Sequence, residues 1–447
     1  MIDRQSLRRT QVMRKSRRCM SLSIILFLLV LGSILTTQPG QAAARGAECN
    51  PGFFERPRLL DSCIRALIEG QGISFDGDYI GNFYGNPAGG RLQKFRSAWR
   101  STFGLNFDLE QMFDVDGAAL RVSGAWTAGR NLATDVETIF NPAEIYGLKG
   151  VRFWELHWSQ KLFQDQLTVR IGRQSPGEYF TSQPPTWDYT NLGFITMGLL
   201  YNEFAYRTRP IGMWGVTGEF EPKGSPLYFT GGVYSGAPRD IQRTEAHGLD
   251  FRFKFKESTV VIGEIGYKRG QTDGSNDLPG TYRFGTIYNS ARFSSLSTPG
   301  RTKHGNVNFY LSGEQMLFRE AGNDRQGLTV FGFLNVPVSS DINLIKFYAM
   351  GGLTYRGLFD GLDEDRTYVG AAFADINNSV GQLVVNSFHG PDIVPNQSYE
   401  AVLEAGHVFQ VTPFWAITPS VQYIINPGLT NDVKNAFVTG IQTVVDF

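Results

Sequence analysis

The 447-residue chain is poor in cysteine, in histidine and in net charge. Its three cysteines are too few for a disulfide-stapled scaffold. The five histidines are scattered, there is neither a Cys-x-x-Cys nor a His-Glu-x-x-His motif, and no glycine loop could bind phosphate, so we expect no metal and no cofactor. Basic and acidic residues each number 42, a balance that argues against nucleic-acid binding. No serine or histidine has a recognisable catalytic setting, so we also expect a protein that is not an enzyme.

Long hydrophobic runs are scarce as well, and the run over residues 20–35 lies near the start of the chain. It is uncharged, follows seven basic residues and one acidic residue, and precedes the small residues Ala42, Ala43 and Ala44. This order is typical of a secretory signal peptide, so we predict removal of residues 1–44. An uncleaved membrane anchor is the alternative, but the run is shorter than the ~20 residues of a spanning helix. The remaining chain has 35 basic and 41 acidic residues, a net charge of about −6.

Two cysteines, Cys49 and Cys63, follow the predicted cleavage site. An even pair in an exported protein predicts a disulfide, which would contribute roughly 3 kcal/mol by closing a loop of about 15 residues. A lipid anchor at Cys49 is the weaker alternative, because no lipoprotein-type signal precedes it. We expect residues 45–70 to form a periplasmic segment with a short helix. Its apolar residues recur at helical spacing before Gly70, namely Leu59, Leu60, Cys63, Ile64, Leu67 and Ile68.

Glycine and aromatic residues are abundant, with 51 glycines, 34 phenylalanines, 18 tyrosines and 7 tryptophans. Beyond residue 71, apolar and polar side chains alternate over many short segments. Because successive residues of a strand face opposite sides, each such segment predicts a strand with one apolar and one polar face. Clear examples are residues 102–109, 167–171, 249–256, 306–312 and 437–447.

Alternation of this kind fits either a soluble β-protein or a transmembrane barrel. The signal peptide, the charges on the polar faces, the segment length of about 9–13 residues and the aromatic strand ends favour the barrel. A sheet in lipid must close on itself, because its backbone groups cannot go unpaired there. We therefore predict an all-β fold, a closed antiparallel transmembrane β-barrel over residues 71–447, with sixteen strands and eighteen as the alternative. A barrel of this size keeps a water-filled channel, which indicates that solutes pass through it.

Several stretches resemble the carbohydrate-selective porin (OprB-type) family of Gram-negative outer membranes. They are GISFDGDYIGNFYGNPAGG at 72–90, WELHWSQKLFQDQLTVRIGR at 154–173, GGVYSGAP at 231–238, YLSGEQMLFR at 310–319, VQYIINPG at 421–428 and NAFVTGIQTVVDF at 435–447. The resemblance implies an outer-membrane location, sixteen strands, loops folded into the pore and passive uptake of mono- or oligosaccharides such as glucose. The terminal Phe447 resembles the signal that the outer-membrane assembly machinery reads. The stretch 357–370 departs from the family pattern, which leaves any role of Arg366 open.

A pore that selects sugars needs hydrogen-bonding groups for the hydroxyls and flat aromatic rings for the sugar faces, with weak binding so that passage continues. Alternation places several basic residues on inward faces, with Arg173 off-parity at a strand end. Residues 175–200 break the alternation and carry three prolines, so we predict a loop that folds in and narrows the pore. The candidate sugar-contact residues are Arg121, Arg170, Arg173, Glu178, Trp187, Arg207, Arg252 and Lys254, and Arg283 is also predicted to face inward.

Two alternatives apply to these residues. The loop aromatics, which include Tyr179 and Tyr189, could simply pack the loop against the wall, and each inward arginine could pair with an inward acid such as Asp76 or Glu155. At the level of function, a general diffusion porin without sugar selectivity is the alternative to a selective one. A barrel enzyme and a secreted soluble β-protein are the alternatives from other classes.

Overall fold

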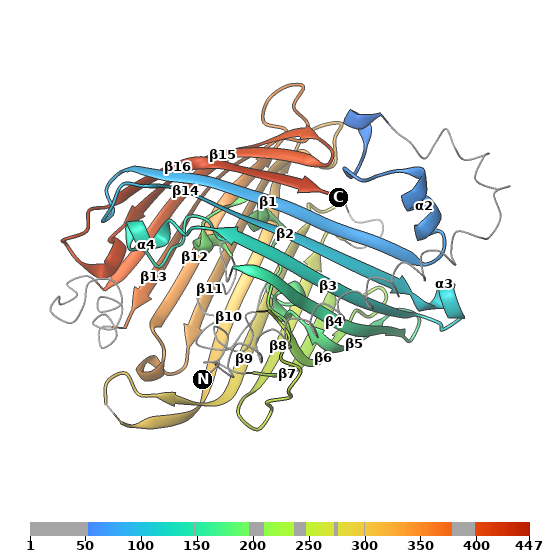
Figure 1. Ribbon diagram of the computed structural model, residues 1–447, viewed down its shortest axis with the longest axis horizontal. Coiled ribbons are helices and arrows are strands. Elements are labelled where there is room, and N and C mark those ends of the chain that lie inside the picture. Colours follow the sequence, from blue (N-terminus) through green and yellow to red (C-terminus); the bar gives the residue numbers. More distant parts are fainter. Residues whose placement is uncertain are drawn as a thin grey trace, which may run out of the picture. The chain divides into compact units, whose positions relative to one another are not determined.

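The computed structural model describes residues 52–145, 149–195, 210–236, 247–271, 276–298, 300–377 and 398–447. Within these ranges, sixteen antiparallel strands form one sheet in which each strand pairs with its sequence neighbours and β1 pairs with β16 (Figure 1). The predicted closed barrel and its strand number are therefore confirmed. The strands are β1 Ile73–Ala88, β2 Phe95–Asp108, β3 Ala118–Gly129, β4 Gly150–Leu162, β5 Leu167–Gln174, β6 Met213–Phe220, β7 Leu227–Ser235, β8 Thr259–Arg269, β9 Gly280–Ser294, β10 Thr302–Arg319, β11 Gly327–Pro337, β12 Ile345–Arg356, β13 Arg366–Ile376, β14 Tyr399–Thr412, β15 Trp415–Ile425 and β16 Ala436–Asp446.

The period-two pattern explains how the two faces of the wall differ. In β7, Leu227, Phe229 and Val233 are exposed on the outer face, whereas Tyr228 and Tyr234 are buried on the inner face. The outward set is apolar because it meets lipid, and closure leaves no sheet edge unpaired. The same alternation sets the outward face of β16, and Phe447 continues it as its backbone N–H donates to the carbonyl of Gly77 at 2.9 Å.

Part of the glycine excess serves inward tyrosines that lie flat on the neighbouring strand. Gly285 of β9 is the register partner of Tyr310 of β10, and a Cβ at Gly285 would overlap the tyrosine ring. Gly266 of β8 stands in the same relation to Tyr228 of β7. Because only glycine leaves room for a ring at such positions, these pairs fix large side chains along the inner wall.

The two ends of the barrel differ in the length of their connections. One end has short turns, such as residues 163–166 and 413–414, whereas at the other end β3 and β4 lie 20 residues apart in sequence and β5 and β6 lie 38 residues apart. In bacterial barrels the short turns face the periplasm and the long loops face the exterior, so we name the ends periplasmic and extracellular. The helices are η1 Phe53–Glu55, α2 Cys63–Glu69, α3 Leu109–Phe113, α4 Ala133–Val136, η2 Pro176–Glu178, η3 Pro184–Asp188, η4 Leu192–Phe194, η6 Ser340–Ile342 and η7 Pro427–Leu429.

The predicted N-terminal helix is present as α2, at the periplasmic end of β1 (Figure 1). The hydroxyl of Ser62 caps it by accepting the backbone N–H of Arg65 at 3.3 Å. Cys63 is disulfide-bonded, and its predicted partner Cys49 lies outside the described residues. None of the helices in the described ranges has both the length and the apolar character that crossing a membrane requires.

The predicted strand over residues 249–256 is wrong, because this segment pairs with no strand and ends in a turn. It runs along the outer wall, where Phe251 and Phe253 contact the ring of Trp214 at 5.7 and 5.2 Å between centroids. Trp214 shares the outward face of β6 with the exposed Val216. The alternation is real, but packing of an extended loop on the wall produces it rather than pairing within the sheet.

Candidate functional site

The loop that follows β5 folds into the barrel, as its broken alternation predicts, and residues 175–195 of it are described. The backbone N–H of Thr181 donates to Glu264 of β8 at 3.0 Å. The side-chain amide of Gln183 donates to the carbonyls of Gly313 of β10 and Gly332 of β11 at 3.1 and 3.0 Å. These bonds join the loop to the inner wall far from the strand that carries it, and we call residues 175–195 the constriction loop.

Buried carboxylates hold the far end of the constriction loop. Glu404 of β14 accepts the backbone N–H and the hydroxyl of Thr190, each at 2.9 Å, and the backbone N–H of Asn191 at 3.0 Å. The side-chain amide of Asn191 also donates to Gln422 of β15 at 2.8 Å. Glu400, earlier in the same strand as Glu404, accepts the hydroxyl of Thr138 and so ties down the loop before β4. Hydrogen bonds of loop donors to charged acceptors make these contacts strong.

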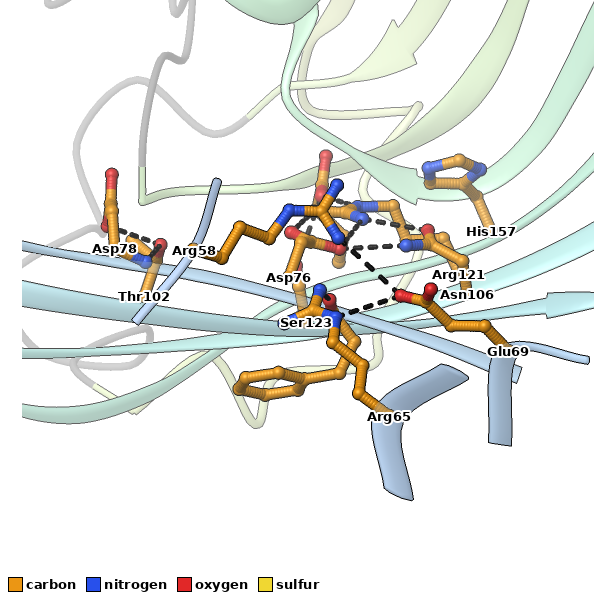
Figure 2. Close-up of polar contacts among 12 residues, drawn as sticks. Arg58, Arg65, Glu69, Asp76, Asp78, Thr102, Asn106, Arg121, Ser123 and His157 are labelled. Carbon is orange, nitrogen blue, oxygen red and sulfur yellow. Dashed lines mark hydrogen bonds and ion pairs between the residues drawn. The ribbon is translucent and has the colours of Figure 1, made fainter. Parts of the chain in front are cut away.

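The inner wall of β1–β5 carries a polar cluster centred on Arg121 of β3 (Figure 2). The Nη1 atom of Arg121 donates to Asp76 and to Asn106, each at 2.8 Å, and its Nε atom donates to Glu155 at 2.9 Å. The hydroxyl of Ser123 donates to the same oxygen of Glu155 at 3.0 Å. The cluster thus presents donors and acceptors side by side while its charges largely compensate each other.

Arg170 of β5 connects this wall to the constriction loop. Its Nη1 atom donates to Glu219 of β6 at 3.0 Å, and its guanidinium lies 4.6 Å from the centre of the Tyr179 ring. The hydroxyl of Tyr179 lies 3.3 Å from Nε2 of His157. Burial is the main cause that raises the pKa of the Tyr179 hydroxyl, with the charge of Glu155 next. The phenol therefore stays neutral and keeps its proton for hydrogen bonding at physiological pH.

A cavity of about 560 Å³ lies on the periplasmic side of the constriction loop. Trp187 lines it with 70% of its surface exposed, although the residue lies inside the barrel. The neighbouring Asp188 accepts a hydrogen bond from Nε of Arg366 at 2.8 Å. Arg325 and Arg356 line the same cavity from the turn before β11 and the end of β12. We call this cavity the vestibule.

The structure places Arg121 and Arg170 on the inner wall and Glu178 and Trp187 in the constriction loop, and their contact with sugar stays a prediction. The alternative of ion pairing also holds for Arg121 and Arg170, since both pair with inward acids. Arg283 faces inward too, and it pairs with Glu314 at 2.6 Å. Arg207 lies outside the described residues.

Three predicted contact residues lie on the outer wall instead. Arg173 is 1% exposed, and it donates to the carbonyls of Trp154 at 3.1 Å and Asp250 at 3.3 Å, beneath the segment that covers Trp214. Arg252 and Lys254 belong to that segment and pair with Asp250 at 2.8 and 3.2 Å. These bonds, that of Arg252 first, hold the pKa of Asp250 well below its usual range. Arg252 and Lys254 were predicted to face inward because their segment alternates as a paired strand does.

Two arginines of the vestibule, Arg325 and Arg356, were not predicted from the sequence. A signal for the second was available, because Arg356 directly precedes the stretch 357–370, which the sequence already singles out together with Arg366. Among the residues that the structure describes, no group of three or more histidine, cysteine, aspartate or glutamate side chains could hold a metal ion.

Comparison with known proteins places this geometry among porins. The sequence model described as carbohydrate-selective porin, OprB family, matches residues 93–447. Porin B of Pseudomonas aeruginosa is 26% identical over 412 residues, which cover 84% of this chain and 87% of that protein. The high-pH structure of Pseudomonas putida OprB, at 23% identity, superposes with a TM-score of 0.80 over 89% of this chain and all of that one. The low-pH structure of the same protein superposes with a TM-score of 0.58.

Proposed function

Because this chain belongs to the OprB family of carbohydrate-selective porins, channels for sugar diffusion across the outer membrane, we propose that its sugar path runs between the constriction loop and the inner wall of β1–β5. The loop anchors Glu264, Gln422 and Glu404 all lie on β8–β15. On the opposite wall the loop meets Arg170 and His157 through Tyr179. By contrast, among the described residues Arg121 pairs only with groups of the wall itself. This asymmetry carries the proposal.

The polar groups on this path suit a neutral solute with many hydroxyls. The arginine fork donates to two neighbouring oxygens, and the paired carboxylate accepts from a hydroxyl. Because Arg121 pairs with Asp76 and Glu155, and Arg170 with Glu219, the path offers hydrogen bonds without a strong field of one sign. A neutral sugar can exchange its hydration water for these groups, whereas an ion gains little, and weak contacts permit release. This argues against a general diffusion pore.

Export and assembly complete the proposed function. Residues 1–44 act as the cleaved signal, residues 45–70 form a periplasmic segment closed by a Cys49–Cys63 disulfide, and residues 71–447 form the pore. Phe447 serves as the signal for the outer-membrane assembly machinery. This role of Phe447 is supported by the position of its ring on the outer wall, where the ring lies 2.9 Å from the point that a Cβ at Gly77 would occupy.

The sugar path is tested by glucose block of single-channel current in planar bilayers. Arg170→Ala removes a charged donor, and such hydrogen bonds are worth about 1.5–3 kcal/mol. We therefore expect at least about a tenfold rise in the glucose concentration that halves the current. Arg252→Ala is the matched control, because Arg252 is 67% exposed on the outer wall, and we expect no change. Unchanged block in Arg170→Ala, or equal loss in both variants, would contradict the proposed path.

A further inference from the structure

Three arginines converge on one wall of the vestibule from separate elements. Arg325 precedes β11, Arg356 ends β12 and Arg366 begins β13. The register sets Arg356 opposite Arg366, and it sets Gly327, two residues after Arg325, opposite Arg356 as well. Strand pairing therefore holds three guanidinium groups close together at the periplasmic mouth.

Acidic partners on this wall are fewer than the arginines. Glu364 is shared between Arg325, at 3.4 Å, and Arg356, while Asp188 pairs with Arg366 at 2.8 Å. Two carboxylates thus lie within ion-pair distance of three guanidinium groups, so in the part of the chain that the structure describes the arginines outnumber the acids that pair with them directly. The side chain of Arg325 is 70% exposed and faces no second carboxylate within ion-pair distance among the described residues. Donor capacity is left over for a ligand.

An exposed aromatic ring stands beside these arginines. Trp187 lies in η3, directly after Pro184, Pro185 and Thr186, and the two prolines fix the backbone that carries it. A tryptophan that presents so much apolar surface inside a barrel offers a flat face on which a sugar ring can stack. Gln410, Thr418 and Gln442 line the same cavity and supply groups that hydrogen-bond to hydroxyls.

We propose that the vestibule is an exit-side subsite for polyhydroxylated monocarboxylates, the sugar-acid class, which rests on the proposed sugar path above. The carboxylate is held by the forks of Arg325 and Arg356, which suit two oxygens in one plane. The hydroxylated body of the solute lies against Trp187. The pore thereby passes sugar acids in addition to neutral sugars.

The charge and the size of the vestibule match this class of solute. The three guanidinium groups concentrate positive charge on the arginine wall, which suits a carboxylate. Asp446 also lines the cavity, but it lies on β16, which β14 and β15 separate from β13. The cavity volume of about 560 Å³ is ample for one such solute.

The test compares gluconate with glucose as blockers of single-channel current, each added from the periplasmic side. We expect wild-type channels to be blocked by gluconate at a concentration about tenfold lower than glucose requires, since a charge-assisted pair adds to the hydroxyl contacts. Arg356→Gln and Arg325→Gln remove one guanidinium each, and we expect either to weaken gluconate block about fivefold or more while glucose block stays unchanged. Arg325 lies in an exposed turn, so Arg325→Gln should fold normally. It therefore keeps the test valid if Arg356→Gln fails to fold.

Arg269→Gln is the matched control, because Arg269 ends β8 at the same periplasmic end and pairs with Asp277 away from the vestibule. Gluconate block that is no stronger than glucose block, or that Arg269→Gln weakens equally, overturns the subsite. Acetate block as strong as gluconate block overturns it in favour of a general anion field, and stronger block by glucose 6-phosphate overturns the monocarboxylate class. Failure of glucose to block the wild type refutes the sugar path itself, whereas intact glucose block without gluconate preference refutes only the subsite.

Discussion

Glu404 is the group on which the position of the constriction loop most depends. Its carboxylate accepts three hydrogen bonds from Thr190 and Asn191 at 2.9–3.0 Å, and the hydroxyl of Tyr368 donates a fourth at 3.3 Å. Glu404→Ala removes the acceptor of all four. Each hydrogen bond to a charged group is worth about 1.5 kcal/mol or more, so the three loop bonds contribute about 4–5 kcal/mol to docking. Water entering the cavity offsets part of this, and we expect about 3 kcal/mol to be lost.

A loss of about 3 kcal/mol lowers the docking equilibrium of the loop about 150-fold. We therefore expect Glu404→Ala channels to show larger and noisier single-channel conductance in planar bilayers, together with weaker glucose block. Glu221→Ala is the control, because Glu221 pairs with Lys268 at an exposed periplasmic turn and should leave both quantities unchanged. Wild-type conductance and wild-type block in Glu404→Ala, with the barrel folded, would refute the role of this carboxylate as the loop anchor.

Two further predictions concern the wall and its outer segment. Gly285→Ala places a methyl group against the Tyr310 ring, so it should destabilise the barrel by about 1–3 kcal/mol and lower its unfolding temperature in detergent. Gly218→Ala is the control and should leave this temperature unchanged, because the space around its Cβ is open. Equal unfolding temperatures for the two variants would contradict the tyrosine–glycine pairing. Because the pKa of Asp250 is lowered in the folded protein, its carboxylate contributes fully to the stability of the outer segment above the ordinary carboxyl pKa of about 3.9. This stability is lost only as the pH falls towards the lower pKa of the folded protein. The resistance of residues 247–258 to protease should therefore stay constant in the wild type from pH 7 to about pH 4. In Asp250→Asn this resistance should already be lower at neutral pH. If the wild type loses it between pH 6 and pH 5, another group controls this segment.

The wall of the barrel follows from the sequence because period two is a local property. Buried and exposed residues alternate along β7 and along the first seven residues of β16, because one face of each strand meets lipid and the other faces the interior. The same rule misplaced Arg252 and Lys254, because any extended segment lying on a surface alternates, whether or not it pairs. Pairing is decided by distant residues such as Trp214, which the local pattern does not contain.

The interior of the channel depends on contacts that are remote in sequence. The broken alternation of residues 175–200 predicts a loop, but nothing local indicates that Thr190 meets Glu404 more than 200 residues away. The vestibule arginines come together through the register of β11–β13, which a sequence does not specify without its pairing partners. Inward arginines were predictable from parity where a true strand existed, as for Arg121 and Arg170.

In the proposed path, sugars bind weakly to groups along the pore as they pass through it. The most direct test is to measure how glucose flux into proteoliposomes depends on glucose concentration. A path with binding groups saturates, so the initial rate should level off as glucose rises, and a neutral non-sugar solute of similar size, such as triethylene glycol, should not compete. A glucose rate that rises linearly over the whole range and equals that of triethylene glycol would contradict a built sugar path.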